Sequence, residues 1–227
     1  MPTILHIESS TKTCSVCVSE NGAVVAIRET HDEQYSHTEN LAVYVDAVIC
    51  EIGGPEELDA VCVSKGPGSY TGLRIGISAA KGLCFSLDIP LLSVTSLASL
   101  TELAKVEVDA MPQDTMMPMI DARRMEVYTA HFDIQGVQKT DISALVVDDQ
   151  TKLTEAGTTY IFGDGATKCK QILSSGNVVH LADIKASAKG MIRIAEAKLD
   201  IEEVEDLAYF EPFYLKEFVA GKPKKIF

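Results

Sequence analysis

The chain has 227 residues and a formal charge of −13 at pH 7, which fits one large domain or two small ones. This charge argues against tight, direct nucleic-acid binding by the chain alone, because it repels a polyanion. No apolar run reaches membrane-spanning length, and residues 1–10 lack the order of a signal peptide. We therefore expect a cytoplasmic protein without a membrane partner, with its six cysteines reduced.

The first half of the chain alternates strand and helix patterns. Asn21-Gly22 is a strong hairpin signal between two strands, and Ser36 and Glu39 form a capping box that opens the first helix. The predicted order is β-β-β-α-β-α-β-α, over residues 3–8, 14–19, 23–29, 39–52, 58–63, 71–87, 90–94 and 96–105.

The second half repeats this order without residue-level identity. Its predicted elements cover residues 116–121, 126–133, 136–147, 149–155, 160–162, 165–174, 177–182 and 186–199. An acidic loop at 107–114 suits a linker, so we predict two α/β units, 1–107 and 108–227. Five large apolar residues between Tyr209 and Leu215 should seek cover, and this tail can pack back on the first unit. The basic end from Lys216 to Lys225 reads as a solvated terminus.

Residues 58–87 combine a buried strand, a glycine turn and a helix. Gly72, Gly76 and Ala80 form a small-residue stripe at four-residue spacing on that helix. The glycines either seat the helix on its own sheet or let another backbone come close, and we favour the closer contact. The turn could also hold a phosphate, but its spacing is neither G-x-G-x-x-G nor a P-loop. Phosphate binding is therefore the minor interpretation.

Cys14 and Cys17 form a single C-x-x-C, which raises the alternative of a redox or metal sensor. Both lie in an alternating strand, where residues three apart point to opposite faces. No second pair completes a zinc site, and the five histidines show no metal-ligand spacing. Packed thiols are the better interpretation.

Five runs together resemble a known family. They are Ile4–Thr11, Ser64–Gly76, Ile120–Tyr128, Phe162–Gly165 and Pro212–Lys216. In this order they are similar to the TsaB (YeaZ) family of bacterial tRNA threonylcarbamoyladenosine biosynthesis proteins, within the actin-like and glycoprotease-like superfamily. The resemblance covers nearly the whole chain.

This resemblance implies an α/β fold of two tandem RNase H-like, actin-like (ASKHA) domains. It implies a role in forming N6-threonylcarbamoyladenosine beside the anticodon of tRNAs that read codons beginning with A. In this family the protein is a non-catalytic subunit that binds the catalytic paralogue TsaD, and the ATPase TsaE joins the complex. A homodimer is expected without TsaD, and tRNA contact is expected only through the complex.

An enzyme on the same fold is the alternative, either a kinase-like phosphotransferase or a glycoprotease-like metallopeptidase. Ser96 and Leu100 stand where the catalytic paralogue carries two metal-binding histidines, and neither side chain replaces an imidazole. Glu8 supplies the acid that actin-like kinases use, but Ser9-Ser10-Thr11 lacks their turn glycine. We therefore expect no catalytic residue, no cofactor and no metal.

The scaffold interpretation needs a partner surface, which we place on the helices of residues 39–52 and 72–85. The predicted interface residues are Glu39, Val43, Tyr44, Asp46, Ala47, Cys50, Gly72, Leu73, Gly76, Ala79, Ala80 and Leu83.

Overall fold

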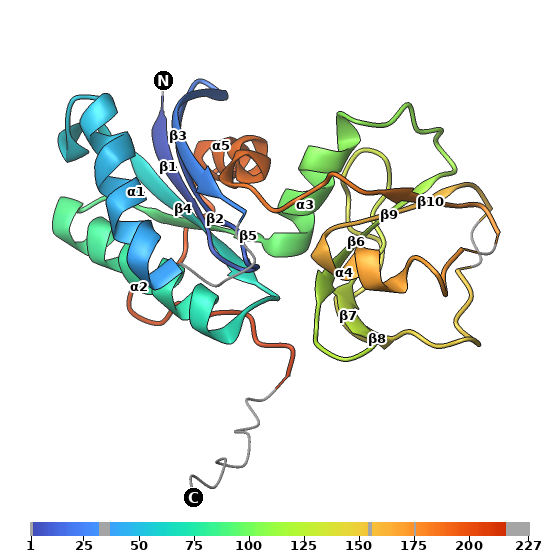
Figure 1. The fold of residues 1–227 in the computed structure, drawn as a ribbon. Helices are drawn as coiled ribbons and strands as arrows, with labels where there is room; N and C mark the ends of the chain where they lie inside the picture. The colour runs from blue at the N-terminus through green and yellow to red at the C-terminus, as the bar shows by residue number, and fades with distance from the viewer. Residues whose placement is uncertain (1, 32–36, 154–155, 175, 217–227) are drawn as a thin grey trace, which may run out of the picture.

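The computed structural model describes residues 2–31, 37–153, 156–174 and 176–216, and the side chains of residues 37 and 38 are not described. Its strands form two five-stranded sheets (Figure 1). The first sheet contains β1 (Thr3–Glu8), β2 (Cys14–Glu20), β3 (Ala23–Thr30), β4 (Ala60–Gly66) and β5 (Leu91–Thr95). The second contains β6 (Thr115–Asp121), β7 (Glu126–Thr129), β8 (Ser143–Val146), β9 (Thr159–Phe162) and β10 (Val178–Leu181).

The two sheets share one topology. The first has the order β3-β2-β1-β4-β5, and the second has the order β8-β7-β6-β9-β10 when it is read from the same end. In each, the first three strands pair antiparallel and the last two add in parallel. The predicted α/β class and the duplicated strand order are therefore confirmed.

Alternating side chains bury both faces of the first sheet. One face, with Leu5 and Ile7 of β1, lies under α1 (His37–Glu51) and α2 (Tyr70–Leu87). The other face, with Ile4 of β1, lies against the short helix η2 (Ala188–Met191) and α5 (Ile192–Asp200). A further short helix, η1 (Pro55–Glu57), precedes β4. Because successive strand residues point to opposite faces, β1 contributes to both cores.

The helices do not follow the division of the chain at 107/108. The strands of the first sheet all precede residue 107, but α3 (Ser96–Lys105) packs its Leu97 and Leu100 into the core of the second sheet. In return, α5 places Ile192 and Ala195 against the first sheet. The predicted second unit thus contains a helix that covers the first sheet, as Figure 1 shows for α5.

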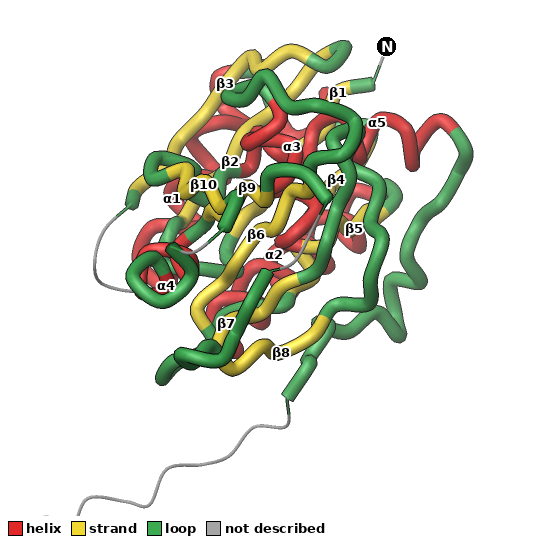
Figure 2. Tube along the Cα trace, turned by 90° about the vertical axis from the view of Figure 1, so that its right-hand side faces the viewer, coloured by secondary structure: helices red, strands yellow, loops and turns green. Residues whose placement is uncertain are grey.

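The second unit departs from the prediction at several elements, and Figure 2, with this unit in front, shows the loops that join its strands. The predicted strand 126–133 ends at Thr129 and the predicted helix 165–174 at Cys169, while the predicted helix 186–199 divides into η2 and α5. No helix occupies 149–153, the described part of the predicted helix 149–155. The Asp148 carboxylate accepts hydrogen bonds from the Gln150 amide at 3.0 Å and the Thr151 hydroxyl at 2.9 Å, which stabilises a turn instead. The predicted strand 136–147 is reduced to β8, because residues 136–142 form a loop. The short α4 (Asp164–Cys169) covers the other face of this sheet.

The C-terminal tail crosses the first unit. Phe210 packs on the core under α2, and the Phe213 amide donates to the Lys65 carbonyl at 2.7 Å. The Lys81 ammonium donates to the carbonyls of Ala208 and Phe210, each at 3.2 Å. Tyr209 stays 83% exposed, so the expectation that all five large apolar residues are covered was wrong.

Two of the sequence-based assignments lie outside the described residues: Ser36 of the capping box and the basic end beyond Lys216. Among the described residues, no helix is both long and apolar enough to cross a membrane.

Candidate partner interface

The predicted interface residues of α1 divide into two groups. Glu39, Val43, Asp46 and Cys50 are exposed, and Val43 is 63% exposed. The two others, Tyr44 and Ala47, are half-buried. The helix is amphipathic. Leu41, Val45 and Val48 face the sheet, so the opposite side of the helix lies in solvent.

The predicted stripe on α2 points inward. Gly72, Leu73, Gly76 and Ala80 are all buried in the chain's own core. A Cβ atom added to Gly76 would lie 2.2 Å from Ser9 Oγ, and Ser9 Oγ donates to the Gly72 carbonyl at 2.9 Å. The small residues therefore let the turn after β1 approach α2. Our reason for assigning these four residues to a partner contact was wrong.

A second stripe on α2 faces solvent instead. Thr71, Ser78, Gly82 and Phe85 are exposed, Phe85 by 82%. A Cβ atom added to Gly82 would meet nothing within 4 Å. Ala79 and Leu83 are half-buried and pack on the same core. Since α1 and α2 lie side by side (Figure 1), their solvent-facing sides adjoin. We call this surface the helical face and define it by eight of its exposed residues: Glu39, Val43, Asp46, Cys50, Thr71, Ser78, Gly82 and Phe85.

The acid at the end of β1 is enclosed by hydroxyl groups. One Glu8 carboxylate oxygen accepts from the Ser10 amide at 2.7 Å and from the Ser64 hydroxyl at 2.9 Å. Its other oxygen is buried and has no partner among the described residues. Burial raises the pKa of this carboxyl group. The group is thus held by its own chain, away from solvent.

Two turns could hold a phosphate, the serine turn after β1 (residues 9–11) and the glycine turn after β4 (residues 65–69), and both use backbone amides for hydrogen bonds within the chain. The Ser9 amide donates to Ser64 Oγ at 3.3 Å, and the Ser69 amide donates to the Ser10 carbonyl at 2.6 Å. Gly68 lies directly against the turn after β1, because a Cβ atom there would come within 2.2 Å of the Ser10 carbonyl oxygen. Anion sites need backbone amides that point at the ligand. These three amides, including that of Ser10, are already occupied.

The two positions tested for metal ligands lie in packed regions. Ser96 and Leu100 are each 1% exposed, and Leu100 contributes to the core of the second sheet. Within the described ranges, no group of three or more His, Cys, Asp or Glu side chains could hold a metal ion.

The C-x-x-C pair is split by the sheet, as the strand geometry predicts. Cys14 packs under the α1–α2 layer, whereas Cys17 packs toward η2 and α5. Burial raises the pKa of Cys14 to about 11 and that of Cys17 to about 12. Both thiols are therefore protonated at neutral pH, which is unlike a reactive redox pair.

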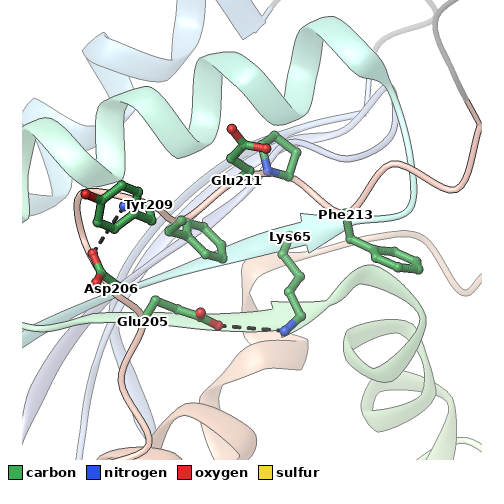
Figure 3. Close-up of a pocket in the computed structure, with 8 residues that line it drawn as sticks. Lys65, Glu205, Asp206, Tyr209, Glu211 and Phe213 are labelled. Carbon is green, nitrogen blue, oxygen red and sulfur yellow. Dashed lines mark hydrogen bonds and ion pairs between the residues drawn. The ribbon is translucent and has the colours of Figure 1, made fainter.

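An open hollow of about 410 Å³ lies beneath the tail (Figure 3). Lys65 and Glu205 face each other across it, with Nζ and Oε1 3.7 Å apart. Asp206 and Glu211 also line it, so its carboxylates outnumber its single lysine. This balance does not suit an anionic ligand.

Comparison with known proteins agrees with this geometry. The family described as "TsaD: tRNA N6-adenosine threonylcarbamoyltransferase" matches residues 28–210. A protein of Bacillus subtilis named tRNA threonylcarbamoyladenosine biosynthesis protein TsaB is 35% identical over 65% of this chain and 61% of the relative. The protein of the same name from Haemophilus influenzae is 33% identical over 56% of this chain and 52% of the relative. The chain thus spans about half to three-fifths of these relatives.

The likeness in structure extends further along the chain. The solved structure of YeaZ from Pseudomonas aeruginosa superposes with a TM-score of 0.81 and 26% identity, and covers 95% of this chain and 100% of that one. This match confirms the tandem actin-like fold. The chain therefore belongs to the family of the threonylcarbamoyltransferase description, and within it to the TsaB/YeaZ proteins.

Proposed function

We propose that this chain is a non-catalytic scaffold subunit in the synthesis of N6-threonylcarbamoyladenosine, beside the anticodon of tRNAs that read codons beginning with A. It acts in the cytoplasm by binding and supporting the catalytic subunit TsaD, and the ATPase TsaE joins the assembly. Without TsaD, the chain pairs with a second copy of itself.

The helical face is the observation that carries this proposal. Val43 and Phe85 expose large apolar side chains from two adjacent helices, and exposed apolar groups that cluster on one surface are typical of interaction sites. At a rise of 1.5 Å per residue, helices of 15 and 18 residues are about 22 and 27 Å long. Two such helices can supply the roughly 800 Å² per partner of a standard interface.

Catalysis by the chain itself is the second candidate, because the matched family is named after a transferase. The packing described above supports the scaffold instead. Leu100 fills a core position where the catalytic paralogue would need an imidazole, and Glu8 is enclosed by serine groups. Neither arrangement leaves a group positioned to hold a metal or a nucleotide phosphate.

The test is co-purification of the full-length chain with TsaD of the same organism, with tRNA modification measured with and without the chain. Val43→Glu/Phe85→Glu should retain the melting temperature and lose TsaD, since both side chains lie in solvent in the free chain. Val146→Glu is the matched control, because Val146 is also exposed but lies on β8 of the second unit.

Two outcomes would overturn the proposal. Modification activity in the chain without TsaD would make it an enzyme. Unchanged TsaD binding by Val43→Glu/Phe85→Glu would remove the helical face as the partner surface.

A further inference from the structure

We infer that the edge of the molecule where the tail meets the β6–β7 hairpin is an RNA contact surface. We call it the cationic edge and define it by Arg74, Arg123, Arg124, Lys168 and Lys216. The inference rests on the proposed function for the identity of the RNA. It concerns an edge that adjoins the helical face at Arg74, an exposed α2 residue between Thr71 and Ser78, and that extends from there to the second unit. Its partner class follows from the arrangement of arginines and tyrosines.

The hairpin carries two arginines at its tip. Ala122 and Glu126 pair at the base, where the Ala122 amide donates to the Glu126 carbonyl at 3.1 Å. Arg123 and Arg124 lie in the loop with φ of 66° and 48°. Glycine and asparagine adopt positive φ more readily than arginine, so this loop keeps two cations at a conformational cost.

The loop is held in place from below. Lys168 of α4 donates to the carbonyls of Arg124 and Glu126, each at 2.7 Å, and forms an ion pair with Asp121. Both arginine side chains are exposed. Because the backbone is fixed while the guanidinium groups stay in solvent, the loop presents two planar cations at a defined position.

The tail connects this loop to aromatic rings on the first unit. Lys216 forms an ion pair with Glu126 and lies 5.7 Å from the centre of the Tyr128 ring. Tyr214 precedes Lys216 by two residues, so their Cα atoms are at most about 7 Å apart. The Tyr214 hydroxyl accepts a hydrogen bond from Arg74 Nε at 3.0 Å.

The aromatic part of the edge lies at the start of α2. The rings of Tyr70 and Tyr214 are 5.0 Å apart, and the Arg74 guanidinium lies 4.1 Å above the Tyr70 ring. Arginine forks match phosphate oxygens, and tyrosine and arginine planes stack on unpaired bases. Asp121 and Glu126 pair with Lys168 and Lys216, and the Asp164 carboxylate, which accepts from the Asp121 amide at 3.0 Å, lies in the same cluster. The three arginines still leave the edge with a net positive charge.

RNA fits this surface better than an acidic protein, because stacked aromatic and guanidinium planes recognise bases as well as charge. The rest of the chain has a net negative charge, so RNA is repelled elsewhere and is oriented with its backbone toward this edge. Affinity of the free chain stays low for the same reason.

The test compares variants of the full-length chain in assembly with TsaD, using an unmodified transcript of a tRNA that reads a codon beginning with A. Arg123→Asn/Arg124→Gly removes both cations and suits positive φ, so it should fold at least as well as the wild type. Its tRNA affinity should fall about tenfold. The slope of log affinity against log salt should decrease by about 1.5, as expected for two lost phosphate contacts.

Lys185→Ala/Arg193→Ala is the control. It removes two exposed cations outside the cationic edge, Lys185 between β10 and η2 and Arg193 on α5. Its affinity should stay within about twofold of the wild type. A second arm repeats the comparison on the free chain at low ionic strength, where weak binding is measurable.

Equal affinity and equal salt slope for Arg123→Asn/Arg124→Gly and the wild type would overturn the inference. Loss of a protein partner without loss of tRNA binding would also overturn it, and would assign the edge to an acidic protein surface. If wild-type chain and TsaD do not assemble, the proposed function fails, and the free-chain arm still decides the RNA contact.

Discussion

Replacing Gly76 with alanine tests why α2 carries small residues. The added Cβ would lie 2.2 Å from Ser9 Oγ, 3.2 Å from Ser9 Cβ and 3.5 Å from Ile7 Cγ2. The hydroxyl must therefore rotate away, and it would lose its 2.9 Å hydrogen bond to the Gly72 carbonyl. Stability of the free chain should fall, although alanine is the better helix former.

The magnitude follows from three contributions. Overpacking a core costs about 1–3 kcal/mol, and a lost hydrogen bond costs about 1 kcal/mol. Glycine to alanine in a helix returns about 1 kcal/mol. The net loss is about 1–3 kcal/mol, which lowers the melting temperature of a chain of this length by roughly 2–12 °C.

Gly82→Ala is the matched control on the same helix. Nothing lies within 4 Å of its added Cβ, so it should gain about 1 kcal/mol and melt roughly 2–4 °C higher. Thermal unfolding of both variants decides the point. Adding Ser9→Ala to Gly76→Ala should recover part of the loss, because the clashing hydroxyl is gone. If Gly76→Ala melts with or above the wild type, α2 does not pack on the turn after β1 as described.

Three further predictions concern other parts of the molecule. Burial lowers the pKa of His6 to about 3, so below pH 6.5 protons bind the unfolded chain preferentially and stability should fall toward pH 3. Urea unfolding at pH 7 and pH 5 should show a smaller loss for His6→Gln, and equal losses would contradict the assignment. Cys50 is the one exposed thiol of the six and should react with a maleimide first; TsaD should slow this reaction, and an unchanged rate would place TsaD elsewhere. Lys81→Met should speed amide exchange in the tail around Phe210 while costing at most about 2 kcal/mol, and unchanged exchange would show that these hydrogen bonds do not hold the tail.

The sequence predicted the strands and their order well, because strands are recognised from the periodic pattern of apolar residues along the chain. The apolar run at residues 3–8 predicted a buried strand, and the strand pattern at residues 14–19 placed Cys14 and Cys17 on opposite sides of the sheet. The Asn21-Gly22 turn fixed the hairpin. These are local signals, and each is read from neighbouring residues alone.

The inward stripe of α2 could not be distinguished from an outward one by spacing. Gly72 and Gly76 fit a close contact, but so do Ser78 and Gly82 on the other side. Which stripe faces the sheet depends on the turn after β1, 63 residues earlier in the chain, where Ser9 needs the space. A contact between distant segments leaves no periodic signal in either one.

The same limit applies to the helices that are exchanged between the sheets. Leu100 reads as an ordinary apolar position of the first half, yet it fills the core of the second sheet, while Ile192 fills the core of the first. A Cβ atom on Gly190 would come within 2.2 Å of the Ser99 carbonyl oxygen, so η2 and α3 pass in close contact. Each sheet therefore depends on the other half of the sequence for cover, and separating the halves would expose both cores. This arrangement suits a scaffold protein, because it holds the helical face of α1 and α2 in a fixed position on the side of the first sheet opposite α5.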